Sequence, residues 1–311
     1  MFDIFQSTSR TENKLFFRKN DPHDVRLGEI VSNTFEDYEA SEIVIIGCPQ
    51  DEGVARNKGR IGAALAPDAI RAQFYKLTNF GIKKKIFDLG NTNICRTLEE
   101  THEIHKNIVK TLLKDKKRII VLGGGNDISY PDGCAMAETF GSENWLAINI
   151  DAHLDVRKEF PRNSGTPYRQ LLDEKLLKPE NFFEIAYQPQ SASPIYFEFL
   201  QNLGATLISL DELCEKESVI KNLQKILTAY HLRPTTFFGF DVDAVCAADA
   251  PGVSASSPIG LTGEEFIELV KFAGENKQTR IIEFTEVNPK FDIDNRTAKL
   301  VAIAMHKFCA V

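Results

Sequence analysis

An apolar run followed by Asp, His and Asp at every second position limits what this chain can fold into. Residues 145–150 (WLAINI) form an apolar run typical of a strand buried in a parallel sheet. Asp151, His153 and Asp155 follow at every second position. In an extended segment, side chains two apart point to the same side, so these three can converge just beyond the strand. Such an oxygen-rich set suits Mn²⁺ or a similar divalent ion.

A second acidic pair strengthens this interpretation. Asp241 and Asp243 follow the apolar residues 236–240 with the same spacing of two. One such motif alone could be an ordinary solvated loop. Four carboxylates packed together would repel one another, and several would have to take up protons. Two divalent ions would balance the four negative charges, so the sequence predicts a metal site.

The rest of the chain alternates between expected strands and helices. We expect strands near residues 43–47, 85–88, 118–122, 146–150, 182–186, 206–208, 236–240 and 279–284. We expect helices near 68–77, 98–114, 129–140, 193–203, 215–229, 262–273 and 295–309. This order predicts a parallel sheet covered by helices. Eight strands suit either an open sheet or a closed barrel, and in both the loops after the strands carry the chemistry.

Residues 1–40 are polar and irregular, and we expect them to form an arm packed on the outside of one domain, 41–311. Further candidate site residues follow other strands. Asn126 comes after a triple glycine, in position to be a metal ligand, and Glu286 could hold a cationic substrate group. Ser164 and Thr166 lie in a small-residue turn, 163–168, that either lines the substrate pocket or is only a turn.

Composition excludes several classes of protein. The formal net charge of −7 argues against a surface that binds nucleic acid. The chain has neither a signal-peptide pattern at its start nor a run of about 18 apolar residues, so we expect no membrane association. The six cysteines are scattered, which favours a cytoplasmic protein with reduced thiols. His102 and His105 lie one turn apart in an expected helix, and an exposed helix face is the favoured interpretation.

Three motifs together resemble the ureohydrolase family of arginases, agmatinases and formimidoylglutamases. They are residues 124–127 (GGND), residues 151–155 (DAHLD), and Asp241-Val242-Asp243 with the following Pro251-Gly252. Within the family, residues 51–60, 164–168 and 291–298 look most like the formimidoylglutamase branch. Where arginases carry a proton-shuttling histidine before Gly-x-Pro, this chain has Ser164.

The resemblance implies a three-layer α/β fold, an open sheet of eight parallel strands with helices on both faces. It also implies two Mn²⁺ ions per subunit bridged by a hydroxide. Asp151 and Asp241 would be shared between the ions, Asp155 would complete one shell, and His153 and Asp243 would complete the other. The family often forms trimers or hexamers, so a homo-oligomer is expected.

The implied reaction is the hydrolysis of N-formimino-L-glutamate to L-glutamate and formamide, a step of histidine degradation. Asp155 and Glu286 would act in catalysis. Ser164 and Thr166 would contact the substrate, and Arg56 and Arg60 could pair with the carboxylates of its glutamate moiety. The alternatives are an agmatinase or another guanidine hydrolase, and a metal-poor, non-catalytic protein on the same scaffold.

One departure from the family pattern supports the last alternative. The family's first metal ligand is a histidine, and here it is Asn126. An amide oxygen is a poorer donor to Mn²⁺ than imidazole. We therefore expect the ion beside Asn126 to be weakly bound or absent. The four aspartates are nevertheless all present.

This departure generates a first prediction. Replacing Asn126 by His should raise both the manganese content of the purified protein and its rate of hydrolysis, because a nitrogen ligand is restored. Elemental analysis and a steady-state assay measure the two quantities. An unchanged manganese content would contradict the assignment of residue 126 as a ligand.

Overall fold

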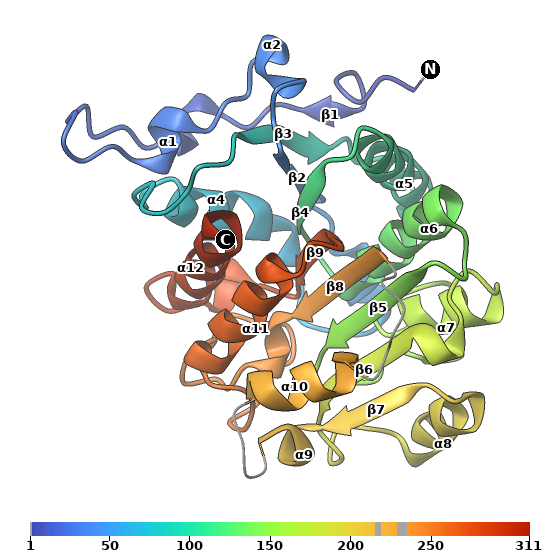
Figure 1. Cartoon of the computed structure of the whole chain (residues 1–311). Coiled ribbons are helices and arrows are strands. Elements are labelled where there is room, and N and C mark those ends of the chain that lie inside the picture. Colours follow the sequence, from blue (N-terminus) through green and yellow to red (C-terminus); the bar gives the residue numbers. More distant parts are fainter. Residues whose placement is uncertain (1, 215–218, 229–234) are drawn as a thin grey trace.

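A single nine-stranded sheet runs through the molecule (Figure 1). The computed structural model describes residues 2–214, 219–228 and 235–311. The strand order is β1-β3-β2-β4-β9-β8-β5-β6-β7, and every neighbouring pair is parallel except β1 with β3. The strands are β1 (Thr8–Ser9), β2 (Ile43–Gly47), β3 (Ile86–Thr92), β4 (Arg118–Leu122), β5 (Trp145–Ile150), β6 (Phe182–Tyr187), β7 (Thr206–Ser209), β8 (Thr235–Asp241) and β9 (Thr279–Thr285).

The central strands are apolar on both faces because helices cover both. Successive side chains of a strand point to opposite faces. In β5, Leu146 and Ile148 join one buried cluster, whereas Trp145 and Ala147 join the other. Burying both faces explains why these strands appear in the sequence as continuous apolar runs without alternation.

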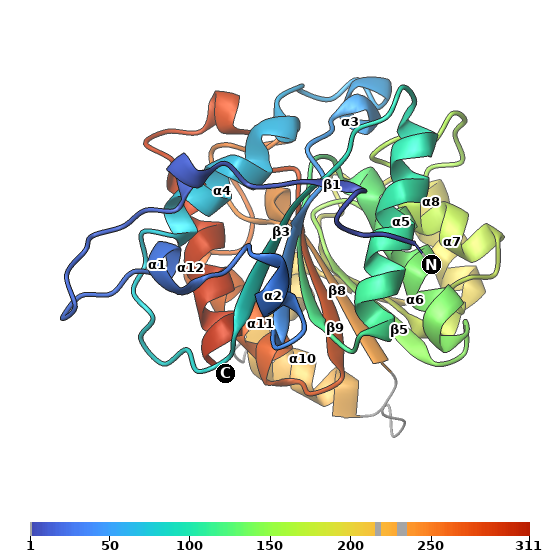
Figure 2. The same ribbon diagram turned by 90° about the horizontal axis from the view of Figure 1, so that it is seen from above.

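Helices form the two outer layers. Figure 2 shows α4, α11 and α12 on one side of the sheet and α5 and α6 on the other. The longer helices are α4 (Ala66–Phe74), α5 (Leu98–Lys114), α6 (Ser129–Phe140), α7 (Pro167–Asp173), α8 (Pro194–Leu203), α10 (Val219–Thr228), α11 (Gly263–Glu275) and α12 (Arg296–Ala310). The short ones are α1 (Leu27–Ile30), α2 (Phe35–Tyr38), α3 (Glu52–Arg56) and α9 (Leu210–Cys214).

Local sequence accounts for several of the helix ends. Thr97 and Glu100 form a capping box at the start of α5, and Thr262 and Glu265 form another at the start of α11. Helix α8 ends at Gly204, which adopts the left-handed conformation that glycine tolerates best. Among the described residues, we find no helix with the length and apolar character needed to cross a bilayer.

The eight expected parallel strands are all present, and the open sheet is confirmed because β1 and β7 form its two edges. The ninth strand, β1, was missed because two residues carry no periodicity. The helices α1, α2, α3, α7 and α9 were also missed, being seven residues or shorter. The helix expected over 215–229 corresponds to α10, and residues 215–218 and 229 lie outside the described part of the chain.

The first 40 residues are bound to the sheet more closely than their polar sequence suggests. Strand β1 pairs antiparallel with β3, and Ile4 and Leu27 are buried. The Thr11 hydroxyl donates to the Asp88 carboxylate over 2.8 Å. The arm therefore extends the sheet at one edge, although a domain boundary near residue 41 stays a prediction.

Asp88 is held by a fully buried cation. Arg71 of α4 donates from Nε and Nη2 to the two Asp88 oxygens, each over 3.0 Å, and both side chains are inaccessible to solvent. The Tyr75 hydroxyl also donates to Asp88. This network joins α4, β3 and the N-terminal arm.

We predict that Arg71→Met lowers the free energy of unfolding by about 3–5 kcal/mol, because it leaves a buried carboxylate without its cation. Urea denaturation measures the change. Lys271→Met is the matched control, since Lys271 and Glu275 form an exposed pair that contributes about 0–1 kcal/mol. Equal losses in the two variants would contradict the structural role given to Arg71.

Candidate metal centre and substrate pocket

The candidate site residues, which include Asn126, meet because the four strands that lead to them are neighbours in the sheet. The order β4-β9-β8-β5 places the carboxyl ends of these strands side by side. Leu122, Phe284, Phe240 and Ile150 stand in one row across them. The next residues carry Asp241 opposite Thr285 and Asp151 beside them. The five predicted carboxylate and imidazole ligands therefore lie together at the carboxyl ends of the central strands β5 and β8.

The candidate ligands form two groups of three side chains, and Asp151 belongs to both. Asp151, His153 and Asp243 can offer three ligand atoms within 4.8 Å of one another, and so can Asp151, Asp155 and Asp241. Within the described residues, Asp243 Oδ1 and Glu286 Oε2 are buried without a hydrogen-bond partner. Buried oxygens without donors are costly, and hard divalent cations prefer carboxylate oxygens. The residues present therefore fit a divalent metal centre.

The electrostatics of the cluster support the same conclusion. Burial raises the pKa of Asp155 and Asp241 well above the usual range, and neighbouring aspartates raise it further. Burial also raises the pKa of Glu286 to about 8. Because protons compensate part of the negative charge when cations are absent, cations that bind here must displace protons.

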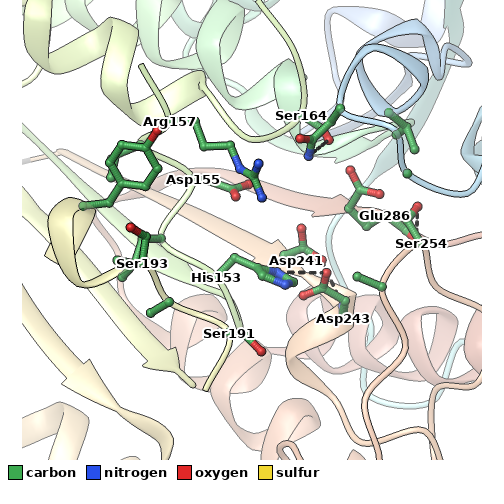
Figure 3. Close-up of a pocket in the computed structure, with 18 residues that line it drawn as sticks. His153, Asp155, Arg157, Ser164, Ser191, Ser193, Asp241, Asp243, Ser254 and Glu286 are labelled. Carbon is green, nitrogen blue, oxygen red and sulfur yellow. Dashed lines mark hydrogen bonds and ion pairs between the residues drawn. The ribbon is translucent and has the colours of Figure 1, made fainter. Parts of the chain in front are cut away.

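His153 supplies a positive charge to the cluster in the absence of metal. Its Nδ1 lies 3.3 Å from Asp243 and 3.4 Å from Asp151. Asp243 is the main cause that raises the pKa of His153, with Asp151 adding to it. Figure 3 shows the imidazole beside Asp243. A metal ligand must be the neutral imidazole, so His153 also has to lose a proton when an ion binds.

Asn126 lies at the cluster, but its amide nitrogen faces the aspartates. The Nδ2 donates to Asp155 over 2.6 Å and to Asp151 over 3.3 Å. Its Oδ1 instead accepts from the Ser129 and Thr285 hydroxyls. The sequence placed Asn126 correctly beside Asp155, whereas its side-chain orientation here is that of a hydrogen-bond donor.

A cavity of about 340 Å³ opens above the cluster (Figure 3). Its floor carries His153, Asp155, Asp241, Asp243 and Glu286. The lining also includes Asn57, Arg157, Ser164, Ser191, Ser193, Tyr196 and Ser254. The guanidinium of Arg157 points into this space in Figure 3. The cavity thus joins an anionic floor to one cationic side chain and several hydroxyls.

Three predicted substrate contacts do not line the cavity. Arg56 pairs with Glu99 over 2.6 Å and with Glu52 over 3.0 Å. Arg60 donates to the backbone oxygens of Val253 and Ser254 and stacks on Phe291. Thr166 is buried and its hydroxyl bonds with the backbone of Asn163. Of the residues predicted to contact the substrate, Ser164 and Glu286 reach the cavity.

Arg157 was missed, although it lies only two residues after Asp155. Its nearest acidic neighbour, Glu159, is 3.8 Å away, so its guanidinium keeps donors for a ligand. A signal was present, because Arg157 continues the spacing of two that runs from Asp151.

The expected exposed face at His102 and His105 is wrong. Both imidazoles are buried, at 2% and 0% exposure. His102 Nε2 lies 2.7 Å from Asp127, and His105 Nδ1 lies 2.7 Å from the Thr92 hydroxyl. Their helix, α5, packs against α6, so this face of α5 is internal.

The fold and the metal-binding edge define a hydrolase of the arginase class. Residues 41–310 match the family model described as "Arginase family", and the chain belongs to this family. Curated relatives include formimidoylglutamases of Staphylococcus aureus, 33% identical over 93% of this chain and 94% of the relative, and of Staphylococcus haemolyticus, 32% identical over 85% and 84%.

Solved structures agree with this assignment. The Trypanosoma cruzi formiminoglutamase with Mn²⁺ has a TM-score of 0.85 at 32% identity, covering 92% of this chain and 97% of that chain. Formimidoylglutamase from Bacillus subtilis has a TM-score of 0.85 at 25% identity, covering 93% and 92%. The protein is accordingly a hydrolase acting on C–N bonds of amidines.

The raised pKa values predict how stability depends on pH. Between the unfolded pKa of a glutamate, about 4.3, and the folded value of about 8 for Glu286, only the folded state keeps the proton. The free energy of unfolding of the metal-free protein should therefore fall as pH rises through this window. His153 acts in the same direction above about pH 6.5, because its folded pKa is raised.

Urea midpoints at several pH values between 5 and 8.5, with a chelator or with Mn²⁺, measure this dependence. Saturating Mn²⁺ should abolish the decline, because bound cations take the place of the protons. A metal-free protein that gained stability from pH 5 to pH 8 would contradict the proposed charge balance.

Proposed function

We propose that the protein hydrolyses N-formimino-L-glutamate to L-glutamate and formamide in a manganese-dependent reaction. The observation that carries the proposal is the pairing of an anionic floor with Arg157 in one cavity. The substrate has matching ends, since its amidine group is cationic and its glutamate moiety carries two carboxylates. Formimidoylglutamases about 32% identical over most of the chain support the same substrate.

Asp151, Asp155, Asp241, His153 and Asp243 would hold two Mn²⁺ ions, and Asp151 belongs to both groups of three side chains. Asn126 would be a further ligand of the ion beside Asp155, once its amide oxygen is turned toward that ion. When bound, such ions lower the pKa of water enough to make hydroxide available near neutral pH. The ligand residues supply the negative charge that keeps the ions in place.

The protein's side chains then orient the substrate and move protons. Water adds to the formimino carbon, the bond from that carbon to the glutamate nitrogen breaks, and the nitrogen gains a proton. Asp155 is a carboxylate at the cavity floor, where it can accept a proton from the attacking water and pass it to that nitrogen. Glu286 would accept a hydrogen bond from the amidine N–H, as its Oε1 already does from the Asn126 backbone over 2.8 Å.

Arg157 would bind a carboxylate of the glutamate moiety, for which a guanidinium is well shaped. The hydroxyls of Ser164, Ser191 and Ser193 lie at the same cavity and can donate to the carboxylates. Arg60 takes a supporting role, because it fixes the backbone of Ser254, which lines the cavity. Agmatine carries a cation at both ends, so Arg157 would repel its ammonium group.

Formamide release from N-formimino-L-glutamate, with added Mn²⁺ and with a chelator, tests the proposal. We expect release that depends on Mn²⁺, and no urea from agmatine. Urea release at a comparable rate would replace the proposed substrate by a guanidine. The absence of any product under saturating Mn²⁺ would leave a non-catalytic protein on this scaffold.

Arg157→Gln should raise the KM for N-formimino-L-glutamate by roughly 10- to 100-fold, since a hydrogen bond to a charged group contributes about 1.5–3 kcal/mol. Steady-state kinetics measure the change. Arg169→Gln is the control, because Arg169 pairs with Asp173 and stacks on Phe199 away from the cavity lining. A KM that is unchanged in Arg157→Gln would exclude Arg157 from substrate binding.

A further inference from the structure

A second group of polar side chains lies two residues before Asp151 and Thr285 in their strands, on the face of the sheet covered by α5 and α6. Strand register places Glu283 of β9 and Asn149 of β5 on either side of Gly239. Both side chains are fully buried, with apolar residues on either side of each in its strand. A carboxyl group inside a buried strand is costly unless it bonds with a partner. The partner of Glu283 is Ser129, which also bonds to Asn126 at the candidate metal centre.

Ser129, the first residue of α6, connects Glu283 to Asn126. Its hydroxyl oxygen lies 3.0 and 3.2 Å from the two Glu283 oxygens and 2.9 Å from Asn126 Oδ1. The Thr285 hydroxyl lies 3.2 Å from the same Asn126 oxygen. Ser129 and Thr285 are buried, at 0% and 1% exposure. The inner end of the Asn126 carboxamide is thus enclosed by two hydroxyls, with a carboxyl group behind one of them.

This enclosure suits both orientations of the carboxamide. An amide NH₂ group donates two hydrogen bonds and has no lone pair for a cation, so a ligand Asn126 must present its oxygen to the ion. A half-turn about the Cβ–Cγ bond exchanges oxygen and nitrogen, and the NH₂ group then needs two acceptors. A hydroxyl can accept as well as donate. Ser129 and Thr285 provide the two acceptors, and Glu283 accepts the Ser129 proton in turn.

We propose that Ser129 and Thr285, with Glu283 behind Ser129, are positioning residues that hold the Asn126 carboxamide with its oxygen toward the ion beside Asp155. The inference rests on the proposed function, because it takes Asn126 as a ligand. The ion selects the oxygen, and the inward-facing NH₂ group then needs acceptors, which the two hydroxyls supply. Partners that orient a ligand in this way commonly change metal affinity by 10- to 100-fold.

Thr285 offers a matched pair of variants. Thr285→Val keeps the shape of the side chain and removes the hydroxyl, whereas Thr285→Ser keeps the hydroxyl and removes a methyl group. If packing of the methyl group matters, Thr285→Ser should bind Mn²⁺ more weakly than Thr285→Val. If the hydroxyl positions Asn126, Thr285→Val should bind Mn²⁺ more weakly than Thr285→Ser. Mn²⁺ titration of the metal-free protein by calorimetry reads the effect without any assay of activity.

We expect Thr285→Val and Ser129→Ala each to weaken one Mn²⁺ site about tenfold and to leave the other within about twofold, with Thr285→Ser close to the unmodified protein. Ser41→Ala is the control for loss of a buried serine hydroxyl, because Ser41 bonds to the Tyr38 backbone far from the cluster. Urea denaturation of the metal-free variants checks that each one folds. If Ser129→Ala fails to fold, the Thr285 pair decides alone.

Asn126→Ala separates the two levels of the argument. If it weakens one Mn²⁺ site while Ser129→Ala and Thr285→Val leave both sites unchanged, Asn126 remains a ligand and the positioning role is wrong. If Asn126→Ala itself leaves both sites unchanged, the ligand set under the proposed function fails. Equal weakening by Thr285→Ser and Thr285→Val would assign the effect to packing and overturn the inference.

Discussion

Repulsion among carboxylates buried at one edge of the sheet is the constraint on which this structure depends. Asp151, Asp155, Asp241 and Glu286 have raised pKa values because burial and mutual proximity disfavour their charged forms. Protons and the His153 imidazolium can relieve part of this repulsion, but divalent cations do so with all the carboxylates ionised. The cost of gathering these groups is therefore the property that suits these strand ends to divalent cations. The strands beneath must be rigid to hold them, and their continuous burial on both faces provides that rigidity.

The second requirement is a cavity that distinguishes the two ends of its substrate. The anionic floor attracts any amidine or guanidine, so it cannot by itself separate formiminoglutamate from agmatine. In the proposed binding mode, Arg157 at the same cavity supplies that distinction, because a guanidinium favours a carboxylate and opposes a second cation. The two arginines expected in this role are engaged elsewhere. Arg56 is neutralised by Glu52 and Glu99, and Arg60 bonds to backbone carbonyls that support the cavity wall.

Much of the fold and of the metal centre could be predicted from local pattern. Long apolar runs separated by amphipathic segments located the eight parallel strands, and the spacing of two after β5 and β8 indicated five candidate ligands, which the structure brings together. Features without local periodicity were missed, such as the two-residue strand β1 and the seven-residue helix α7. The burial of His102 and His105 was also missed, since an amphipathic helix does not reveal whether its polar face meets solvent or another helix. Buried polar residues within the strands, including Glu283 and Asn149, are visible in the sequence, but their purpose depends on neighbours distant in the chain.

The sequence by itself determined which chemical groups follow which strands, because side-chain identity and strand periodicity are local properties. It therefore specified the acidic and imidazole ligands, and it specified Asn126 where the family carries histidine. Only the tertiary structure decided that β9 lies between β4 and β8, which brings Asn126, Thr285 and the aspartates to one place. Strand order follows from long-range packing of two helical layers, and no local pattern encodes it. The same packing decided which arginine faces the cavity and which hydroxyls enclose the Asn126 amide, since both depend on contacts between segments far apart in the chain.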